Sequence, residues 1–300
     1  MALGYDKSLY ILAFDHRGSF QKKFFGIAGQ PSPEESDRIS DAKSAIAEGF
    51  FQAVDDGAPK DYCGLLVDEQ FGADIARRAR KEGFKFAMPV EKTGQDEFDF
   101  DYGEDFGAHI EEFDPTFSKV LVRYNPEGDA AMNERQVGRL RRLSDWLHDR
   151  DRKFLFELLV PAEPAQLEKV DGDADRYDKE LRPDLMLRAI TELQSAGVEP
   201  DIWKIEGLDK RQDCERIAKQ GRSGGRDQVA CVVLGRGADE AAVVHWLRQG
   251  SGVPGYIGFA IGRTIWWDAL KAYVDGNSKR EDASAAISGN YRRMIDAYNS

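Results

Sequence analysis

A lysine lies in the middle of an apolar segment, DIWKIEGL, at residues 201–208. The bulky and β-branched residues around Lys204 favour a buried strand, where an ammonium group is unusual. An amine with apolar walls and nearby cations keeps more of its unprotonated form, which can attack a carbonyl carbon to form a Schiff base. Lys204 is therefore a candidate Schiff-base nucleophile. The alternative is a structural lysine that forms an ion pair with Glu157 or Glu206.

A carboxylate lies in a second apolar segment, FLFELLV, at residues 154–160. An unpaired charge in such a strand is costly, so Glu157 is expected either to neutralise an inward cation or to have its pKa raised by burial. A carboxyl group with a raised pKa beside an amine can move protons around an iminium. We interpret Glu157 as the acid/base of the same site, with a simple ion pair as the alternative.

Two Gly-Arg corners, LGRG and IGRT, end apolar segments near the C-terminus. Glycines let a backbone approach an anion closely, and their N–H groups can face it. The alternative is a pair of tight turns with surface arginines. We predict a phosphate site formed by Gly235, Arg236, Gly237, Gly262 and Arg263.

Eight short apolar segments are predicted to be strands, and these strands would position the residues named above. The segments are SLYILAF (8–14), CGLLVDE (63–69), KFAMPVE (85–91), SKVLVRY (118–124), KFLFELLVP (153–161), DIWKIEGL (201–208), VACVVLGRG (229–237) and YIGFAIGR (256–263). Amphipathic stretches separate them and predict helices, notably at 33–56, 133–151, 182–197 and 279–298.

This alternation predicts a (β/α)₈ barrel of one domain over residues 1–300. A doubly wound open sheet is the alternative, but the first strand is not followed by GxGxxG. The acidic, aromatic segment 93–115 is long for a connection and predicts either a lid over the barrel mouth or a solvated insertion.

In such a barrel, side chains at the carboxyl ends of the strands share one mouth. Lys204 and Glu206 face the same side because side chains alternate along a strand. The polar residues expected to contact substrate there are His16, Arg17, Lys92, Arg123 and Glu206. The FDHR motif that contains Asp15 could instead be a simple turn after the first strand.

Charge and composition restrict the class of partner. A net charge of -12 without a basic block argues against nucleic acid, and no apolar run approaches the roughly 20 residues that span a bilayer. We expect a cytoplasmic protein whose three widely spaced cysteines serve packing. Asp15, Glu69 and Glu157 could bind Mg²⁺, but nothing in the sequence requires a metal or another cofactor.

Several segments together are similar to a known family. ILAFDHRGSF, DYCGLLVDEQFG, MPVEKTGQDEFDFDYG, KVLVRYNPEGD, DIWKIEGL and GFAIGRTIWWDAL resemble the aldolase-like C-terminal domain of bifunctional 5-dehydro-2-deoxygluconokinases of bacterial inositol catabolism. The resemblance runs over nearly the whole chain, and a more distant one links AFDHRG to tagatose-bisphosphate aldolases. It implies that Lys204 is the Schiff-base lysine and Glu157 the acid/base, with Asp15 and Arg17 in the first-strand motif. His16 departs from the glutamine usual in the tagatose enzymes.

The resulting hypothesis is a class I aldolase, a carbon–carbon lyase with Lys204, Glu157 and Asp15 as catalytic residues. The resemblance implies the substrate 2-deoxy-5-keto-D-gluconate 6-phosphate, cleaved to dihydroxyacetone phosphate and malonate semialdehyde. A metal-dependent aldolase, a sugar-phosphate isomerase and a non-catalytic sugar-phosphate-binding barrel remain alternatives. The sequence leaves both a monomer and a homo-oligomer open.

Overall fold

Eight parallel strands form a closed barrel in the computed structural model, which describes residues 2–300. Each strand pairs with the next, and the last pairs with the first. The strands are β1 (Leu9–Ala13), β2 (Cys63–Leu66), β3 (Lys85–Pro89), β4 (Phe117–Arg123), β5 (Lys153–Leu159), β6 (Ile202–Glu206), β7 (Ala230–Leu234) and β8 (Tyr256–Ile261). Each matches one predicted segment to within one residue at its start, so the predicted (β/α)₈ barrel is confirmed.

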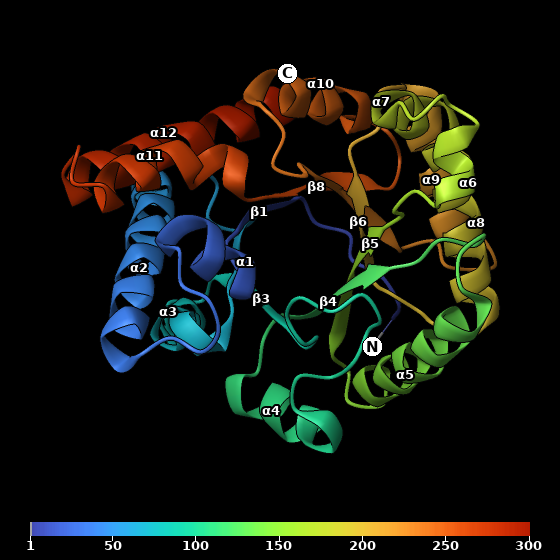
Figure 1. The fold of residues 1–300 in the computed structure, drawn as a ribbon, viewed down its shortest axis with the longest axis horizontal. Helices are drawn as coiled ribbons and strands as arrows, with labels where there is room; N and C mark the ends of the chain where they lie inside the picture. Colours follow the sequence, from blue (N-terminus) through green and yellow to red (C-terminus); the bar gives the residue numbers. More distant parts are fainter. Residues whose placement is uncertain (1) are drawn as a thin grey trace.

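Helices follow the strands and surround the barrel (Figure 1). They are α1 (Gly18–Phe20), α2 (Pro33–Asp55), α3 (Glu69–Lys81), α4 (Phe106–Phe113), α5 (Ala130–His148), α6 (Pro164–Glu168), α7 (Ala174–Arg176), α8 (Arg182–Ser195), α9 (Arg211–Gly221), α10 (Glu240–Gly250), α11 (Arg263–Val274) and α12 (Arg280–Asn299). Two π-helical turns, η1 (Gln21–Phe25) and η3 (Tyr177–Leu181), and the 3₁₀ turn η2 (Gly103–Asp105) complete the set. Within residues 2–300, no helix has the length and apolarity needed to cross a membrane.

Alternation along the strands separates two cores. Residues that point outward pack against the helices, whereas inward residues from all eight strands form a small apolar core inside the barrel. These inward residues are Leu9, Ile11, Ala13, Leu66, Ala87, Phe117, Leu155, Ile202, Ala230, Val232 and Ala260. Two residues further along their strands, Lys119, Glu157 and Lys204 follow Phe117, Leu155 and Ile202 on the same face. A charged layer therefore lies directly above an apolar floor.

The C-terminal helix α12 packs on α2 and α11 at the outside of the barrel (Figure 1). Its buried Tyr291 donates a hydrogen bond of 2.6 Å to the carbonyl oxygen of Tyr10 in β1. This contact connects the last helix to the first strand and supports the position where β8 closes onto β1.

The segment expected to be a lid or an insertion contains η2 and α4, the helix after β3. Phe98 and Phe100 are buried, and Phe100 forms an antiparallel bridge with Glu91 just beyond β3. The phenylalanine side chains of the segment are therefore packed into the protein, while many of its polar residues are exposed. Thr93, Gly94 and Gln95, with the preceding Lys92, line the barrel mouth. A lid function stays a prediction.

Candidate active site

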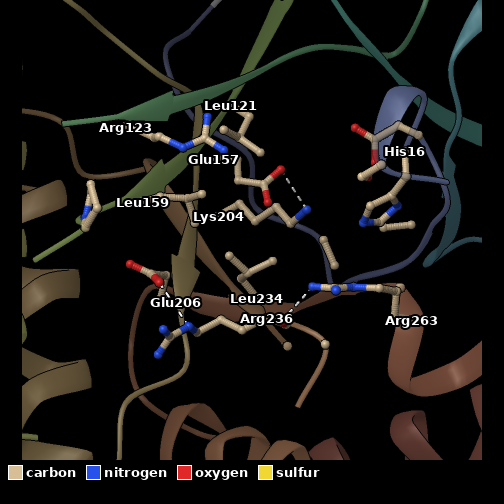
Figure 2. A pocket seen from close by; sticks show the side chains of 18 of the residues that line it. His16, Leu121, Arg123, Glu157, Leu159, Lys204, Glu206, Leu234, Arg236 and Arg263 are labelled. Carbon is tan, nitrogen blue, oxygen red and sulfur yellow. Dashed lines mark hydrogen bonds and ion pairs between the residues drawn. The ribbon is translucent and has the colours of Figure 1, made fainter. Parts of the chain in front are cut away.

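A cavity of about 650 Å³ opens at the carboxyl ends of the strands (Figure 2). All thirteen predicted site residues lie on its wall: Asp15, His16, Arg17, Lys92, Arg123, Glu157, Lys204, Glu206, Gly235, Arg236, Gly237, Gly262 and Arg263. Their proximity follows from the barrel, whereas their individual roles stay predictions.

Lys204 projects into the centre of the cavity from β6 (Figure 2). It is only 2% exposed, and its Nζ lies 2.9 Å from Oε2 of Glu157. The two residues are direct partners in the β5–β6 ladder, so neighbouring strands present the amine and the carboxylate side by side. The pair satisfies both sequence interpretations, since an ion pair and a nucleophile with its base share this geometry.

A second buried lysine, Lys119, is not among the predicted site residues, yet it contacts three carboxyl groups of the charged layer. Lys119 Nζ lies 2.7 Å from Asp15 Oδ2, 2.8 Å from Glu91 Oε1 and 3.1 Å from Glu157 Oε2. Period-two alternation could have identified it, because Lys119 shares a strand face with Arg123. The predicted site favoured residues at the very ends of strands, and Lys119 lies inside β4.

The pKa values in this cluster follow from the balance between burial and charge. Burial alone would raise the pKa of Glu157, but Lys119 and Lys204 outweigh it and lower the pKa. The expectation of a raised pKa was therefore wrong, because the sequence did not show that two cations flank this carboxylate. At Asp15, burial alone would also raise the pKa. Lys119 and His16 outweigh it and hold the pKa of Asp15 below its usual range.

Glu91 is the carboxyl group in the cluster with a raised pKa. Burial is the largest cause, and Lys119 and Arg17 offset it only in part. Its Oε2 is buried without a hydrogen-bond partner in the described structure. Lys119 itself stays protonated, because Asp15, Glu157 and Glu91 together overcome its burial and raise its pKa.

His16 lines the cavity as a neutral imidazole at neutral pH. Burial lowers its pKa to about 4, Arg263 contributes in the same direction, and Asp15 opposes both. Its buried Nδ1 has no hydrogen-bond partner within residues 2–300. The ring packs edge-on against Trp266 at a centroid distance of 5.9 Å. His16 can therefore offer a neutral hydrogen-bonding group to a ligand.

Two of the predicted substrate contacts are already engaged by the polypeptide. Arg17 donates to Asp101 Oδ2 at 2.6 Å and to the carbonyl oxygen of Glu91 at 2.5 Å. Lys92 forms an ion pair of 2.9 Å with Asp99. Arg17 thus ties the segment after β3 to the barrel, whereas the ion pair of Lys92 and Asp99 lies within that segment.

The two Gly-Arg corners differ in the state of their arginines (Figure 2). Arg236 forms ion pairs with Asp178 and with Glu206, the latter at 3.1 Å. Glu206 also accepts from Arg182 Nη1 at 2.9 Å and from the backbone N–H of Val160 at 3.0 Å. These contacts indicate that Arg236 and Glu206 stabilise the wall of the cavity. Their predicted contacts with substrate and phosphate stay predictions.

Arg263 carries its charge into the cavity without a carboxylate partner in the described chain. Its Nη2 donates to the carbonyl oxygen of Arg236 at 2.8 Å. Gly237 has a φ of 73°, and a Cβ there would lie 2.5 Å from the guanidinium carbon of Arg263. The glycine is therefore needed for this packing. Arg263 also begins α11, whose first N–H groups are available to an anion.

The arrangement supplies an amine, an adjacent carboxylate, a fixed ammonium group and a basic corner. This set can form an imine and move protons around it. No cluster of three or more His, Cys, Asp or Glu side chains suited to holding a metal ion occurs within residues 2–300.

Comparison with known proteins places the chain in a family. The family model described as "Uncharacterized protein conserved in bacteria (DUF2090)" matches residues 4–300. No curated protein matches the chain.

Solved structures share the fold. Cgl0159 from Corynebacterium glutamicum has a TM-score of 0.61 at 16% identity, over 99% of this chain and 88% of that one. A Schiff base forming fructose-1,6-bisphosphate aldolase has a TM-score of 0.55 at 14% identity, over 93% of this chain and 92% of that one. Identities this low establish similarity of fold alone.

Proposed function

This chain belongs to the bacterial family DUF2090, and we propose that it is a class I aldolase that cleaves a phosphorylated keto compound through an imine on Lys204. The observation that carries the proposal is the buried contact of 2.9 Å between Lys204 Nζ and Glu157 Oε2 inside the cavity. The fold similarity to a Schiff base forming aldolase is consistent with it.

In the proposed reaction, Glu157 takes a proton from Lys204, and the free amine attacks the ketone carbon of the substrate. The carbinolamine takes up a proton on oxygen and loses water, which leaves a protonated imine. A carboxylate then removes the proton of the hydroxyl group β to the imine carbon. The carbon–carbon bond breaks, its electrons enter the enamine, and an aldehyde leaves. Protonation of the enamine and hydrolysis of the imine release the second product and restore Lys204.

The carboxyl groups of the charged layer are suited to the proton transfers of this reaction. Asp15 and Glu157 are ionised at neutral pH because their pKa values are lowered, so either can accept the hydroxyl proton. Glu91, with its raised pKa, is the carboxyl group best suited to stay protonated. Lys119 contacts all three groups, so it can hold the layer in place while protons move.

The phosphate of the substrate is proposed to bind at Arg263, with the N–H groups at the start of α11 and the glycines of the two corners around it. The finer proposal for the substrate is 2-deoxy-5-keto-D-gluconate 6-phosphate, giving dihydroxyacetone phosphate and malonate semialdehyde. It rests on the resemblance of several segments to the aldolase-like domain of the gluconokinases.

A panel of phosphorylated keto sugars and keto sugar acids, read out by triose phosphate release, tests the function. We expect turnover of at least one member, unchanged in EDTA because the protonated imine serves as the electron sink. Activity that EDTA abolishes and a divalent cation restores would instead support a metal-dependent aldolase or an isomerase. Ligand binding without turnover of any member would favour a non-catalytic barrel.

A further inference from the structure

Four arginines line the cavity, and their charges are not equally available. Arg17 is paired with Asp101, and Arg236 with Asp178 and Glu206. The other two arginines, Arg123 and Arg263, have no ion pair with any carboxylate in the described chain.

Arg123 and Arg263 are instead held through backbone carbonyl oxygens. Arg123 Nη1 donates to the carbonyl oxygen of Gln95 at 2.7 Å, and Arg263 Nη2 donates to that of Arg236 at 2.8 Å. A carbonyl group orients a guanidinium without neutralising it. Both side chains are half-buried in the cavity wall, so each presents a full positive charge at a fixed position.

The barrel places these two charges on opposite sides of the nucleophile. Arg123 ends β4 and Arg263 follows β8, and in a closed ring of eight strands β4 and β8 face one another. Lys204 lies on β6, midway between them in strand order. Figure 2 shows the same arrangement, with Lys204 between Arg123 and Arg263.

The surroundings of the two arginines differ. Arg263 lies at the start of α11, next to Gly237, where several N–H donors suit the oxygens of a phosphate. Arg123 pairs with Leu159 across the β4–β5 ladder, and Lys92 nearby on the wall is already neutralised by Asp99. One guanidinium with a free planar edge matches the two oxygens of a carboxylate.

We propose that Arg123 is the specificity-determining residue for a carboxylate at the substrate end opposite the phosphate. The inference rests on the proposed function and names the residue that distinguishes an acid from an uncharged substrate. Only one of the five N–H donors of Arg123 is used by Gln95. The Nε–Nη2 edge is therefore open for a bidentate contact.

The test compares two substrates that differ at one group. The acid is 2-deoxy-5-keto-D-gluconate 6-phosphate, and its alcohol counterpart has CH₂OH in place of the carboxylate. We expect the wild type to favour the acid in kcat/KM by at least about 10-fold, with most of the difference in KM. In Arg123→Met, the ratio of the two kcat/KM values should fall by about 10- to 100-fold, the scale of one charge-assisted hydrogen bond.

Two further variants complete the design. Arg123→Lys keeps the charge without the planar fork and should retain part of the preference for the acid. Arg141→Met removes an exposed arginine of α5 outside the cavity and should leave the ratio as in wild type. Circular dichroism and thermal melts confirm that the variants are folded.

Three results would overturn the inference. These are equal use of acid and alcohol by the wild type, an unchanged ratio in Arg123→Met, or preference for a keto sugar 1,6-bisphosphate that Arg123→Met abolishes. The last result would assign a second phosphate to Arg123.

Borohydride trapping of wild-type protein with dihydroxyacetone phosphate, which lacks the distal end of the substrate, separates the carboxylate site from the proposed function. If dihydroxyacetone phosphate forms a reduced adduct on Lys204 but the wild type uses acid and alcohol equally, only the carboxylate site is refuted. If no ketone forms an adduct, the proposed function is refuted as well.

Discussion

At the scale of single residues, Lys119 determines the charge state of the candidate site. It is buried among Asp15, Glu91 and Glu157, and Glu157 shares one oxygen between Lys119 and Lys204. Because the two ammonium groups neutralise the ionised Asp15 and Glu157, neither lysine can be removed without leaving buried negative charge unpaired.

Lys119→Met should therefore lower the free energy of unfolding by about 3–5 kcal/mol, the usual cost of removing one partner from a buried ion pair. Chemical denaturation measures this change. The matched control is Lys179→Met, since Lys179 is 58% exposed and lies 4.0 Å from its partner Asp209. Its effect should stay below about 1 kcal/mol. Equal stability of Lys119→Met and wild type would contradict the ion-pair account.

His16 gives a prediction for pH dependence. Its pKa is about 4 in the folded protein against ~6.5 unfolded, so below pH ~6.5 the unfolded chain binds a proton that the folded chain does not. Stability should therefore fall as pH falls from ~6.5 towards 4, by about 1.5 kcal/mol between pH 6.5 and 5. Urea unfolding at the two pH values should show a smaller loss for His16→Gln. The same pH dependence in variant and wild type would refute the lowered pKa of the His16 imidazole.

At the scale of elements, period-two alternation and strand ends are local signals, and they predicted the eight strands and the shared face of Lys204 and Glu206. The pairing of charges could not be predicted in the same way. Asp101 neutralises Arg17 from 84 positions along the chain, and Asp178 neutralises Arg236 from 58. The lowered pKa of Glu157 has the same origin, because it depends on which cations the folded barrel brings to it.

The strand junction that closes the barrel gives a second structural prediction. Gly258 in β8 has a φ of 151°, and a Cβ there would lie 1.9 Å from the carbonyl oxygen of Leu9 in β1. Gly258→Ala should therefore cost more than about 3 kcal/mol of stability, because backbone atoms must shift. In the control Gly138→Ala, on the exposed face of α5, nothing lies within 4 Å of the added Cβ. This change should stabilise by about 0.5–1 kcal/mol. Denaturation curves that rank the two variants the other way would contradict the closing geometry.

At the scale of the whole molecule, the candidate site exists only because the barrel is closed. Asp15, Glu91, Lys119, Glu157 and Lys204 come from the ends or interiors of five different strands or their loops. The chain carries a net charge of -12, yet Arg123 and Arg263 keep unpaired positive charge at the mouth. An acidic protein with a locally basic cavity is suited to a small anionic substrate.

The measurement that tests the central claim most directly is borohydride reduction in the presence of a phosphorylated ketone, followed by peptide mass analysis. We predict that the peptide containing Lys204 gains the mass of a reduced secondary amine, only when both reagents are present and only in the folded protein. Glu157→Gln should still be labelled at Lys204 while its turnover falls about 10²- to 10⁴-fold, since it loses proton transfer. Lys204→Met should fold, remain unlabelled and lose turnover. Label on Lys92 or Lys119 instead, with Lys204→Met still active, would show that Lys204 is only an interior ion-pair partner.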